Sequence, residues 1–435
     1  MKYFGIDIGT SSICGVCHDE ATRHNVTLTK ANDAALPSSH PWEFRQDPER
    51  IFLIVRQLLE ELLTDDVTHI GFSGQMHGIL YVDADGQAVS PLYTWQDGCG
   101  DQPYKDNLSH AQWLTRQTGC NVATGYGLVT HFYNLQHDAV PVTARYLCTV
   151  MDYVTMQLCH TTVPLCEPSN AASLGFFDKQ SLQFDGEALS KASIDTAMLP
   201  QVCSADTIVG NYMFHGRAIP VYVAIGDNQA SFIGAVNQCD TDVVVTIGTS
   251  SQLSVYTKDY VEAPPLETRP LPGGGYILVG AALCGGCSLA MLNHFFGDTV
   301  RQFTGQQLTD EEIYVHMFAP LTREDTKETL PLNVDTTFEG TRQDPTRRGK
   351  IAGITLRNFT PENLVAGFMQ GICNELNDFY TALPPQLREG RTTLVGTGNA
   401  LRHNGLLRKV LSDTFGLPLT LSPCAEEAAI GAGKR

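Results

Sequence analysis

The pentapeptide Ile-Gly-Thr-Ser-Ser occurs twice in the chain, at residues 8–12 and 247–251. Each copy follows a short apolar run typical of a buried strand, at 2–7 and 243–247, and precedes another at 13–18 and 253–256. The same strand–turn–strand unit in two halves of comparable size indicates an internal duplication. A Gly/Thr/Ser turn exposes backbone N–H groups that can surround an anionic oxygen, although a single copy would also suit an ordinary hairpin.

The rest of the chain alternates between helical and strand patterns. Apolar residues at helical spacing predict helices at 49–63, 229–236, 288–296, 361–383 and 406–415. Further apolar runs predict strands at 69–73, 219–225, 276–281 and 393–395. This alternation favours an α/β fold, and we place a domain boundary near residue 238, giving domains 1–238 and 239–435. The Pro/Gly-rich stretch 258–275 is predicted to be a surface loop.

Composition narrows the class of protein. The net charge of −18 argues against a nucleic-acid partner, which would require clustered basic residues. The one basic cluster, 342–350, is interpreted as a solvated hairpin, and the paired acids Glu426 and Glu427 as a solvated helix end. No run of about 18 apolar residues suggests a membrane span, and no apolar leader opens the chain. With 13 cysteines in no regular framework, we expect reduced thiols and a cytoplasmic protein. The sequence does not determine the oligomeric state, and a homodimer is one candidate.

Two aspartates stand where strands end. Asp7 lies beside the first turn, where its carboxylate could orient Mg²⁺ directly or through water. Asp227 follows an apolar strand in the segment AIGDNQAS, so it could act as a general base or simply cap the next helix.

At this point the motifs resemble those of a known family. GIDIGTSS, VVVTIGTSSQLSV and LVGTGNALRHN are similar to the two phosphate motifs and the adenosine motif of the FGGY carbohydrate kinases. GFSGQMHGILYVD, TWQDG, ATGYG, MDYV and NAASLGFFD are similar to the branch of that family that phosphorylates sedoheptulose. The resemblance implies a two-domain hexokinase–actin fold, a duplicated ribonuclease H-like architecture with its active site in a cleft between domains that close. It also implies Mg·ATP as co-substrate and the terminal hydroxyl of a ketose as acceptor.

The resemblance assigns roles residue by residue. It makes Asp227 the catalytic base and Asp7 the magnesium ligand. Residues implied to bind the sugar are Gln75, Met76, His77, Trp95, Gln96, Asp97 and Asn228. The first five of these offer amide, imidazole and apolar surfaces that suit a polyol, whereas Trp95 and Asp97 could equally be a buried ring and a capped turn. Residues implied to bind the nucleotide are Thr10, Ser11, Ser12, Gly248, Thr249, Ser250, Gly285, Gly286, Gly396, Gly398, Asn399, Ala400 and Asn404.

Two positions depart from the family pattern. Cys14 and Cys99 stand where the family commonly has basic residues, and cysteine cannot reproduce the planar fork of arginine. Two alternatives therefore remain at this stage. One is a kinase of the same family for xylulose or another pentulose or polyol, and the other is a catalytically weak sensor that binds sugar or nucleotide.

Overall fold

The first Gly-Thr-Ser turn joins two antiparallel strands in the computed structural model, which describes residues 1–322 and 332–434. These strands are β1 (Lys2–Ile8) and β2 (Ser12–Asp19), and they pair with Asp7 opposite Cys14. On the far side of β2 lies the antiparallel β3 (His24–Ala31), and on the other side of β1 lies the parallel β5 (Ile70–Gly74). The strands predicted around this turn are confirmed.

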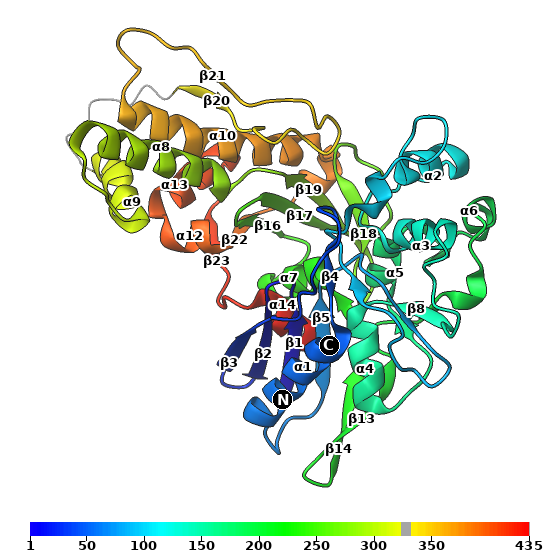
Figure 1. The fold of residues 1–435 in the computed structure, drawn as a ribbon. Helices are drawn as coiled ribbons and strands as arrows, with labels where there is room; N and C mark the ends of the chain where they lie inside the picture. The colour runs from blue at the N-terminus through cyan, green and yellow to red at the C-terminus, as the bar shows by residue number, and fades with distance from the viewer. Residues whose placement is uncertain (323–331, 435) are drawn as a thin grey trace. The chain divides into compact units, whose positions relative to one another are not determined.

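The second turn has the same surroundings. It joins β16 (Asp242–Ile247) to the antiparallel β17 (Ser251–Thr257). β17 pairs in turn with the antiparallel β19 (Tyr276–Ala282), while β16 pairs with the parallel β22 (Thr393–Thr397). Two sheets therefore repeat one pattern of three antiparallel strands and one parallel strand, as the internal duplication predicts (Figure 1).

The chain divides into two compact units. Unit 1 comprises Met1–Gly234, Arg269–Gly275 and residues 426–434. Its main sheet has the order β13-β14-β5-β1-β2-β3, with β15 also pairing with β5. The strands not yet given are β13 (Ile208–Phe214), β14 (Arg217–Tyr222) and β15 (Ile225–Gly226). The helices around it are α1 (Pro48–Leu62), α4 (Val150–Cys159), α7 (Asp227–Ala235) and α14 (Glu427–Gly433).

Local chemistry explains where two of these helices lie. Asp47 caps α1 by accepting hydrogen bonds from the N–H groups of Glu49 and Arg50, and the apolar stripe of α1 enters the core of the sheet. α14 packs against β1 and β5 (Figure 1, red beside dark blue). This packing depends on glycine, because a Cβ on Gly5 would lie 1.8 Å from the carbonyl oxygen of Ala429.

Unit 1 has a second apolar core, which includes Leu114, Leu128 and Leu174. The remaining helices of unit 1 are η1 (Gly98–Asp101), α2 (His110–Thr118), α3 (Gly127–Gln136), α5 (Pro168–Leu174), α6 (Gly186–Lys191) and η2 (Thr196–Met198). The remaining short strands are β4 (Arg45–Gln46), β6 (Leu80–Val82), β7 (Leu92–Tyr93), β8 (Tyr146–Cys148), β9 (Leu165–Cys166), β10 (Phe177–Asp178), β11 (Gln183–Phe184) and β12 (Gln201–Val202).

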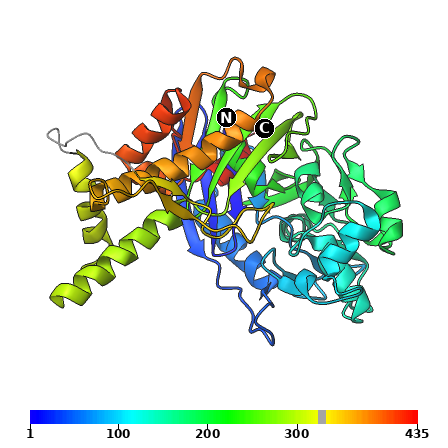
Figure 2. The ribbon, with the colours of Figure 1, turned by 90° about the horizontal axis from the view of Figure 1, so that it is seen from above.

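Unit 2 comprises Ala235–Thr268 and Tyr276–Ala425. The second main sheet has the order β18-β19-β17-β16-β22-β23, with β18 at Glu267–Pro270 and β23 at Leu419–Leu421. The helices are α8 (Gly286–Thr304), α9 (Asp310–Phe318), η3 (Ala319–Thr322), α10 (Pro361–Ala382), α11 (Pro385–Arg388), α12 (Asn399–His403) and α13 (Gly405–Phe415). A hairpin of β20 (Asn333–Asp335) and β21 (Lys350–Ala352) lies next to α10, the long orange helix of Figures 1 and 2.

Three expectations about local structure need revision. The strand predicted at 219–225 is two strands, β14 and β15, and the following helix starts at Asp227 rather than at residue 229. The stretch 258–275 is not simply a surface loop, because it contains β18, in which Thr268 and Pro270 are buried.

The predicted domain boundary at residue 238 lies between α7 and β16. Within the described residues, no helix has the length and apolar character needed to cross a membrane.

Candidate active site

Asp7 and Asp227 come together at one edge of the unit 1 sheet. Asp7 and Ile225 both pair with Ser73 of the parallel strand β5, so Asp227 follows its strand at the level where β1 ends. The carboxyl ends of parallel strands are where α/β sheets usually carry ligand sites. The Ser73 hydroxyl donates a hydrogen bond to Asp7 Oδ1 at 2.8 Å, which fixes the Asp7 carboxyl group.

Both carboxyl groups have perturbed acidity. Burial raises the pKa of Asp227 to about 7, and the negative charge of Asp7 acts in the same direction, while the Asn228 N–H and Arg269 oppose it. Burial also raises the pKa of Asp7 to about 6, with Ser73 opposing and Glu426 reinforcing the shift. A carboxylate that titrates near neutral pH is better suited to accept a proton than an ordinary aspartate. The geometry therefore supplies a candidate general base next to a second acid.

Glu426 contributes a third acidic group here. It precedes α14, is only partly exposed, and its charge acts on both Asp7 and Cys14. Glu426 lies at a helix end, as predicted, but it is only partly solvated, because α14 packs on β1. Neighbouring carboxylates such as Asp7 and Asp227 attract a cation, and oxygen ligands of this kind suit Mg²⁺. Among the described residues, no three His, Cys, Asp or Glu side chains form a ready-made metal cage.

The first turn is hydrogen-bonded to two of the residues that the sequence assigns to the sugar. Trp95 Nε1 donates to Thr10 Oγ1 at 2.9 Å, and the Thr10 hydroxyl donates to Gln75 Oε1 at 3.3 Å. Gln75 Nε2 donates to Gln46 Oε1, and Gln46 Nε2 returns to the Thr10 carbonyl, each at 2.9 Å. The Thr10 hydroxyl therefore both accepts and donates a hydrogen bond within the protein. In this turn Ser11 and Ser12 are the exposed residues.

The Trp95–Asp97 segment divides into an exposed and a buried part. The Trp95 ring is 47% exposed, and Gln96 is exposed as well. Asp97 is 1% exposed, and its two oxygens accept hydrogen bonds from the N–H groups of Cys99 (3.1 Å) and Phe44 (3.2 Å). Asp97 thus caps η1, which is the structural role weighed for it above, and its contact with a sugar stays a prediction.

His77 is held in a defined orientation at the end of the segment after β5. Its backbone takes a positive φ of 75°, and its ring stacks on Tyr126 at 4.7 Å between centroids. His77 Nδ1 lies 2.7 Å from the Ser173 carbonyl oxygen, so Nδ1 carries the proton that is donated. In the neutral ring Nε2 is then the hydrogen-bond acceptor, which suits a sugar hydroxyl. Met76 beside it is buried against Gly226.

Three of the segments predicted to bind the nucleotide meet in unit 2: the second turn, Gly285–Gly286 and the adenosine motif. The N–H of Gly286 donates to the Gly248 carbonyl at 2.8 Å, and the N–H of Cys287 donates to the Thr249 carbonyl at 3.1 Å. A Cβ on Gly285 would lie 2.5 Å from the Ser250 carbonyl oxygen, so glycine is needed for this approach. Gly285 and Gly286 therefore bring the start of α8 against the second turn.

The adenosine motif lies beside the same turn. Gly398 has a φ of +85°, and a Cβ there would lie 2.4 Å from the Ile247 carbonyl oxygen. Asn399 and Ala400 open α12 directly afterwards, and Gly396 lies in β22, where leucine side chains surround it. Asn404 caps α13 through Oδ1, which accepts from the Leu407 N–H at 3.0 Å. Its Nδ2 is buried without a hydrogen-bond partner among the described residues, so it is a donor suited to a ligand.

Sequence reasoning missed several residues of unit 1. Tyr126 and Ser173 lie within the motifs ATGYG and NAASLGFFD, so closer reading of those motifs would have found them. Ser73 occupies the strand position that pairs with Asp7, which only a register assignment reveals. Arg269 comes from the stretch interpreted as a surface loop, and no sequence signal points to it.

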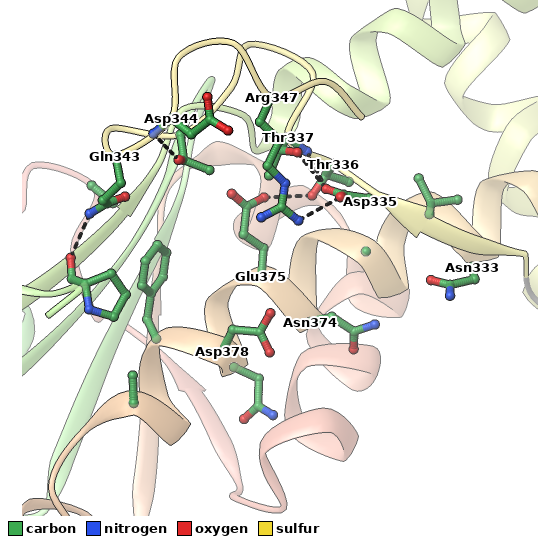
Figure 3. Close-up of a pocket in the computed structure, with 18 residues that line it drawn as sticks. Asn333, Asp335, Thr336, Thr337, Gln343, Asp344, Arg347, Asn374, Glu375 and Asp378 are labelled. Atoms are coloured by element: carbon green, nitrogen blue, oxygen red, sulfur yellow. Dashed lines mark hydrogen bonds and ion pairs between the residues drawn. The ribbon is translucent and has the colours of Figure 1, made fainter. Parts of the chain in front are cut away.

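A separate cavity of about 710 Å³ lies in unit 2, between α10, β20 and the 341–347 segment (Figure 3). Arg347 Nη2 donates to Asp335 at 2.8 Å, and Thr336 donates to Glu375 at 2.8 Å. The basic segment 342–350 is thus not merely a solvated hairpin, because Arg347 forms an ion pair within this cavity. None of the residues assigned above to sugar, nucleotide or metal lines it.

The two sheets with their matching hairpin turns have the architecture of a two-domain kinase. The xylulose kinase structure from Rhodospirillum rubrum is similar to this fold with a TM-score of 0.83 at 19% sequence identity. The match covers 99% of this chain and 88% of that structure. A glycerol kinase structure with ADP from Plasmodium falciparum matches over the same shares with a TM-score of 0.77 at 18% identity. At these identities the likeness concerns the fold.

The chain belongs to the FGGY family of carbohydrate kinases: residues 2–234 match the N-terminal domain of that family and residues 243–433 its C-terminal domain. Among curated relatives, the sedoheptulokinases of Mus musculus and Homo sapiens are 29% and 28% identical, each over 98% of this chain and 95% of the relative. The glycerol kinase of Alteromonas mediterranea is 27% identical over 89% of this chain and 80% of the relative. The protein is a carbohydrate kinase, a phosphotransferase whose family uses a nucleotide as donor.

Proposed function

We propose that this kinase transfers the γ-phosphate of Mg·ATP to the terminal primary hydroxyl of sedoheptulose, producing sedoheptulose 7-phosphate. The observation that carries this proposal is the full-length similarity to two sedoheptulokinases, which covers 98% of this chain. The motifs TWQDG, ATGYG and NAASLGFFD contribute Trp95, Tyr126 and Ser173 to one region of unit 1, which supports the same acceptor class. The free thiols are consistent with a cytoplasmic location.

Asp227 is the proposed catalytic base. Its carboxylate accepts the proton of the acceptor hydroxyl, and the sugar oxygen forms the new bond to the γ-phosphorus. The bond between that phosphorus and the bridging oxygen breaks, and ADP leaves with its electron pair. Because phosphoryl transfer depends mainly on positioning and charge stabilisation, a base with a pKa of about 7 is adequate for the proton.

Asp7 is the proposed holder of Mg²⁺, directly or through water. The donor set fits this ion, because burial raises the pKa values of Asp7 and Asp227, and a cation would stabilise the charged forms of these two carboxyl groups. When bound, Mg²⁺ would neutralise charge on the phosphate oxygens. The Ser73 hydroxyl keeps the Asp7 carboxyl group in place for this role.

The remaining assignments divide between the two proposed domains. In residues 1–238, His77 Nε2, Gln96, Trp95 and Asn228 would contact the sugar, with Gln75, Met76 and Asp97 shaping the site around them. In residues 239–435, the second turn, the start of α8, Gly396 and the Gly398–Asn404 segment would hold the nucleotide. Thr10, Ser11 and Ser12 of the first turn are likewise proposed to bind the nucleotide. The buried amide donor of Asn404 is the clearest structural support for a ligand in the second set.

A second candidate acceptor is xylulose or a related polyol. The xylulose kinase of Staphylococcus xylosus is 27% identical over 67% of this chain and 63% of the relative, which keeps this possibility open. The sensor alternative loses support, since the relatives named above are kinases.

The test is ADP release from Mg·ATP with sedoheptulose, xylulose, ribulose, fructose and glycerol as acceptors. We expect the highest kcat/KM with sedoheptulose, exceeding the next acceptor by about tenfold or more, because a site that hydrogen-bonds extra hydroxyls discriminates against sugars lacking them. A higher kcat/KM with xylulose or glycerol would transfer the assignment to that acceptor. The position of the phosphate, read by ³¹P–¹H NMR of the product, tests the terminal hydroxyl.

A further inference from the structure

The segments that form the proposed catalytic centre contain very little positive charge. No lysine or arginine occurs in residues 7–14, 95–99 or 225–232, which carry the first turn, the Trp95 segment and the base. A phosphoryl-transfer site nevertheless needs positive charge near the developing negative charge. Arg269 brings such a charge from β18, distant in sequence from all three segments, and it belongs to unit 1 together with them.

Arg269 is hydrogen-bonded to Asn228, the residue next to the proposed base. Its Nη1 donates a hydrogen bond to Asn228 Oδ1 at 3.0 Å. The neighbouring residues reinforce the contact, since Gln229 Nε2 donates to the Pro270 carbonyl at 3.2 Å and Gln229 is fully buried. Two consecutive residues of β18 are thus bonded to two consecutive residues of α7. This pairing holds the guanidinium beside the start of α7, where its charge also acts on Asp227.

The hydrogen bond determines which way the Asn228 amide faces. Because a guanidinium only donates, the atom that it contacts must be the amide oxygen, and Nδ2 then faces the other way as a donor. Next to a carboxylate base, an N–H donor suits an acceptor oxygen, either the sugar hydroxyl before transfer or the phosphoryl oxygens during it. Without Arg269, the amide could rotate and present its oxygen instead.

We propose that Arg269 is a positioning residue for phosphoryl transfer, which orients the Asn228 amide as a donor toward the acceptor and supplies positive charge beside Asp227. This inference rests on the proposed function of Asp227 and Asn228 in that reaction. It assigns a role to a residue outside every motif that identifies the family in this sequence.

The experiment compares Arg269→Met, which keeps the side-chain length, with Arg269→Lys, which keeps the charge. Arg56→Met is the matched control, because Arg56 is an exposed helix residue of unit 1 paired with Glu60. kcat and the KM values for sugar and for ATP are measured separately, and the urea unfolding midpoint is followed for each variant. Arg269→Ala is assayed with and without millimolar guanidinium, far below denaturing concentrations.

For Arg269→Met we expect kcat to fall by about 10- to 100-fold with a raised sugar KM, because a transition-state donor is lost, and the KM for ATP to stay within about twofold. Arg269→Lys should recover part of kcat, and guanidinium should raise the rate of Arg269→Ala, neither of which a purely structural role would produce. Arg56→Met should match the wild type.

Two results would overturn the inference. One is Arg269→Met with wild-type kcat and sugar KM, and the other is a loss of activity that neither lysine nor guanidinium relieves and that accompanies a lowered unfolding midpoint. If the wild-type enzyme prefers another sugar, the proposed substrate is wrong, and the same comparison of variants is made on the preferred sugar.

Discussion

Replacing Asp227 by asparagine should abolish catalysis and, at the same time, make the protein more stable at neutral pH. Asparagine has nearly the same shape but cannot accept the acceptor proton and carries no charge. As the proposed base, Asp227 should be needed for turnover, so we expect kcat to fall by at least about 10³-fold. The stability gain follows from the electrostatic cost of keeping a charged Asp227 buried beside Asp7.

The size of the expected stability gain follows from the raised pKa of Asp227. Burial and the charge of Asp7 raise the pKa of Asp227 from 3.8 to about 7. At about 1.4 kcal/mol per pKa unit, a shift of about three units sets an upper bound of about 4 kcal/mol at a pH above 7. Asp227 keeps some contact with solvent, which screens its charge, so we expect a gain of about 2 kcal/mol.

The direction of the pH dependence follows from the number of protons that the folded and unfolded states bind. Between about pH 4 and pH 7 the folded protein retains the Asp227 proton that the unfolded chain has already released, so the folded state binds more protons. This group therefore makes the wild type less stable as the pH rises through that window. The asparagine of the variant does not titrate, so the advantage of Asp227→Asn should be about 2 kcal/mol at about pH 8 and should disappear below about pH 4.

Tryptophan fluorescence is a suitable probe, because Trp42, Trp95 and Trp113 all lie in unit 1 together with Asp227. Urea unfolding is followed without nucleotide and in the presence of EDTA, so that no cation offsets the charge. Asp85→Asn, at an exposed turn residue of unit 1, is the control and should change the midpoint little at either pH. Equal or lower stability of Asp227→Asn at about pH 8, or a gain that does not vary with pH, would refute the reasoning.

Three further changes test other parts of the site. His77→Ala should raise the KM for the sugar by about 10-fold or more and leave the KM for ATP unchanged in steady-state kinetics, because one hydrogen bond to the sugar is lost. Gly398→Ala forces a Cβ to within 2.4 Å of the Ile247 carbonyl oxygen at a φ of +85°; it should weaken nucleotide binding measured by calorimetry and lower stability by more than about 1 kcal/mol. Removal of Mg²⁺ by EDTA should stop turnover, whereas quenching of tryptophan fluorescence by the sugar should persist; loss of both would contradict separate sugar and metal roles.

Much of the architecture could be predicted from local patterns. The duplicated hairpins at 2–19 and 242–257 are visible in the sequence because β-branched and aromatic runs flank identical small-residue turns, and both pairs of strands are confirmed. The long helix α10 is predicted almost to the residue, since its apolar positions recur at helical spacing over about six turns. Asp7 and Asp227 stand out because each follows an apolar strand, and the structure brings both to one sheet edge.

The sequence by itself thus determined the class of fold, the repeated turns and those site residues that lie in recognisable local motifs. Only the tertiary structure placed Glu426 beside Asp7 and Arg269 beside Asn228. These residues stand hundreds or tens of positions away from their partners, and their own local patterns indicate no more than a helix end and a loop. The physical reason is that strand and helix periodicity is encoded by near neighbours, whereas burial, charge pairing and amide orientation depend on which distant segments the packed core brings together.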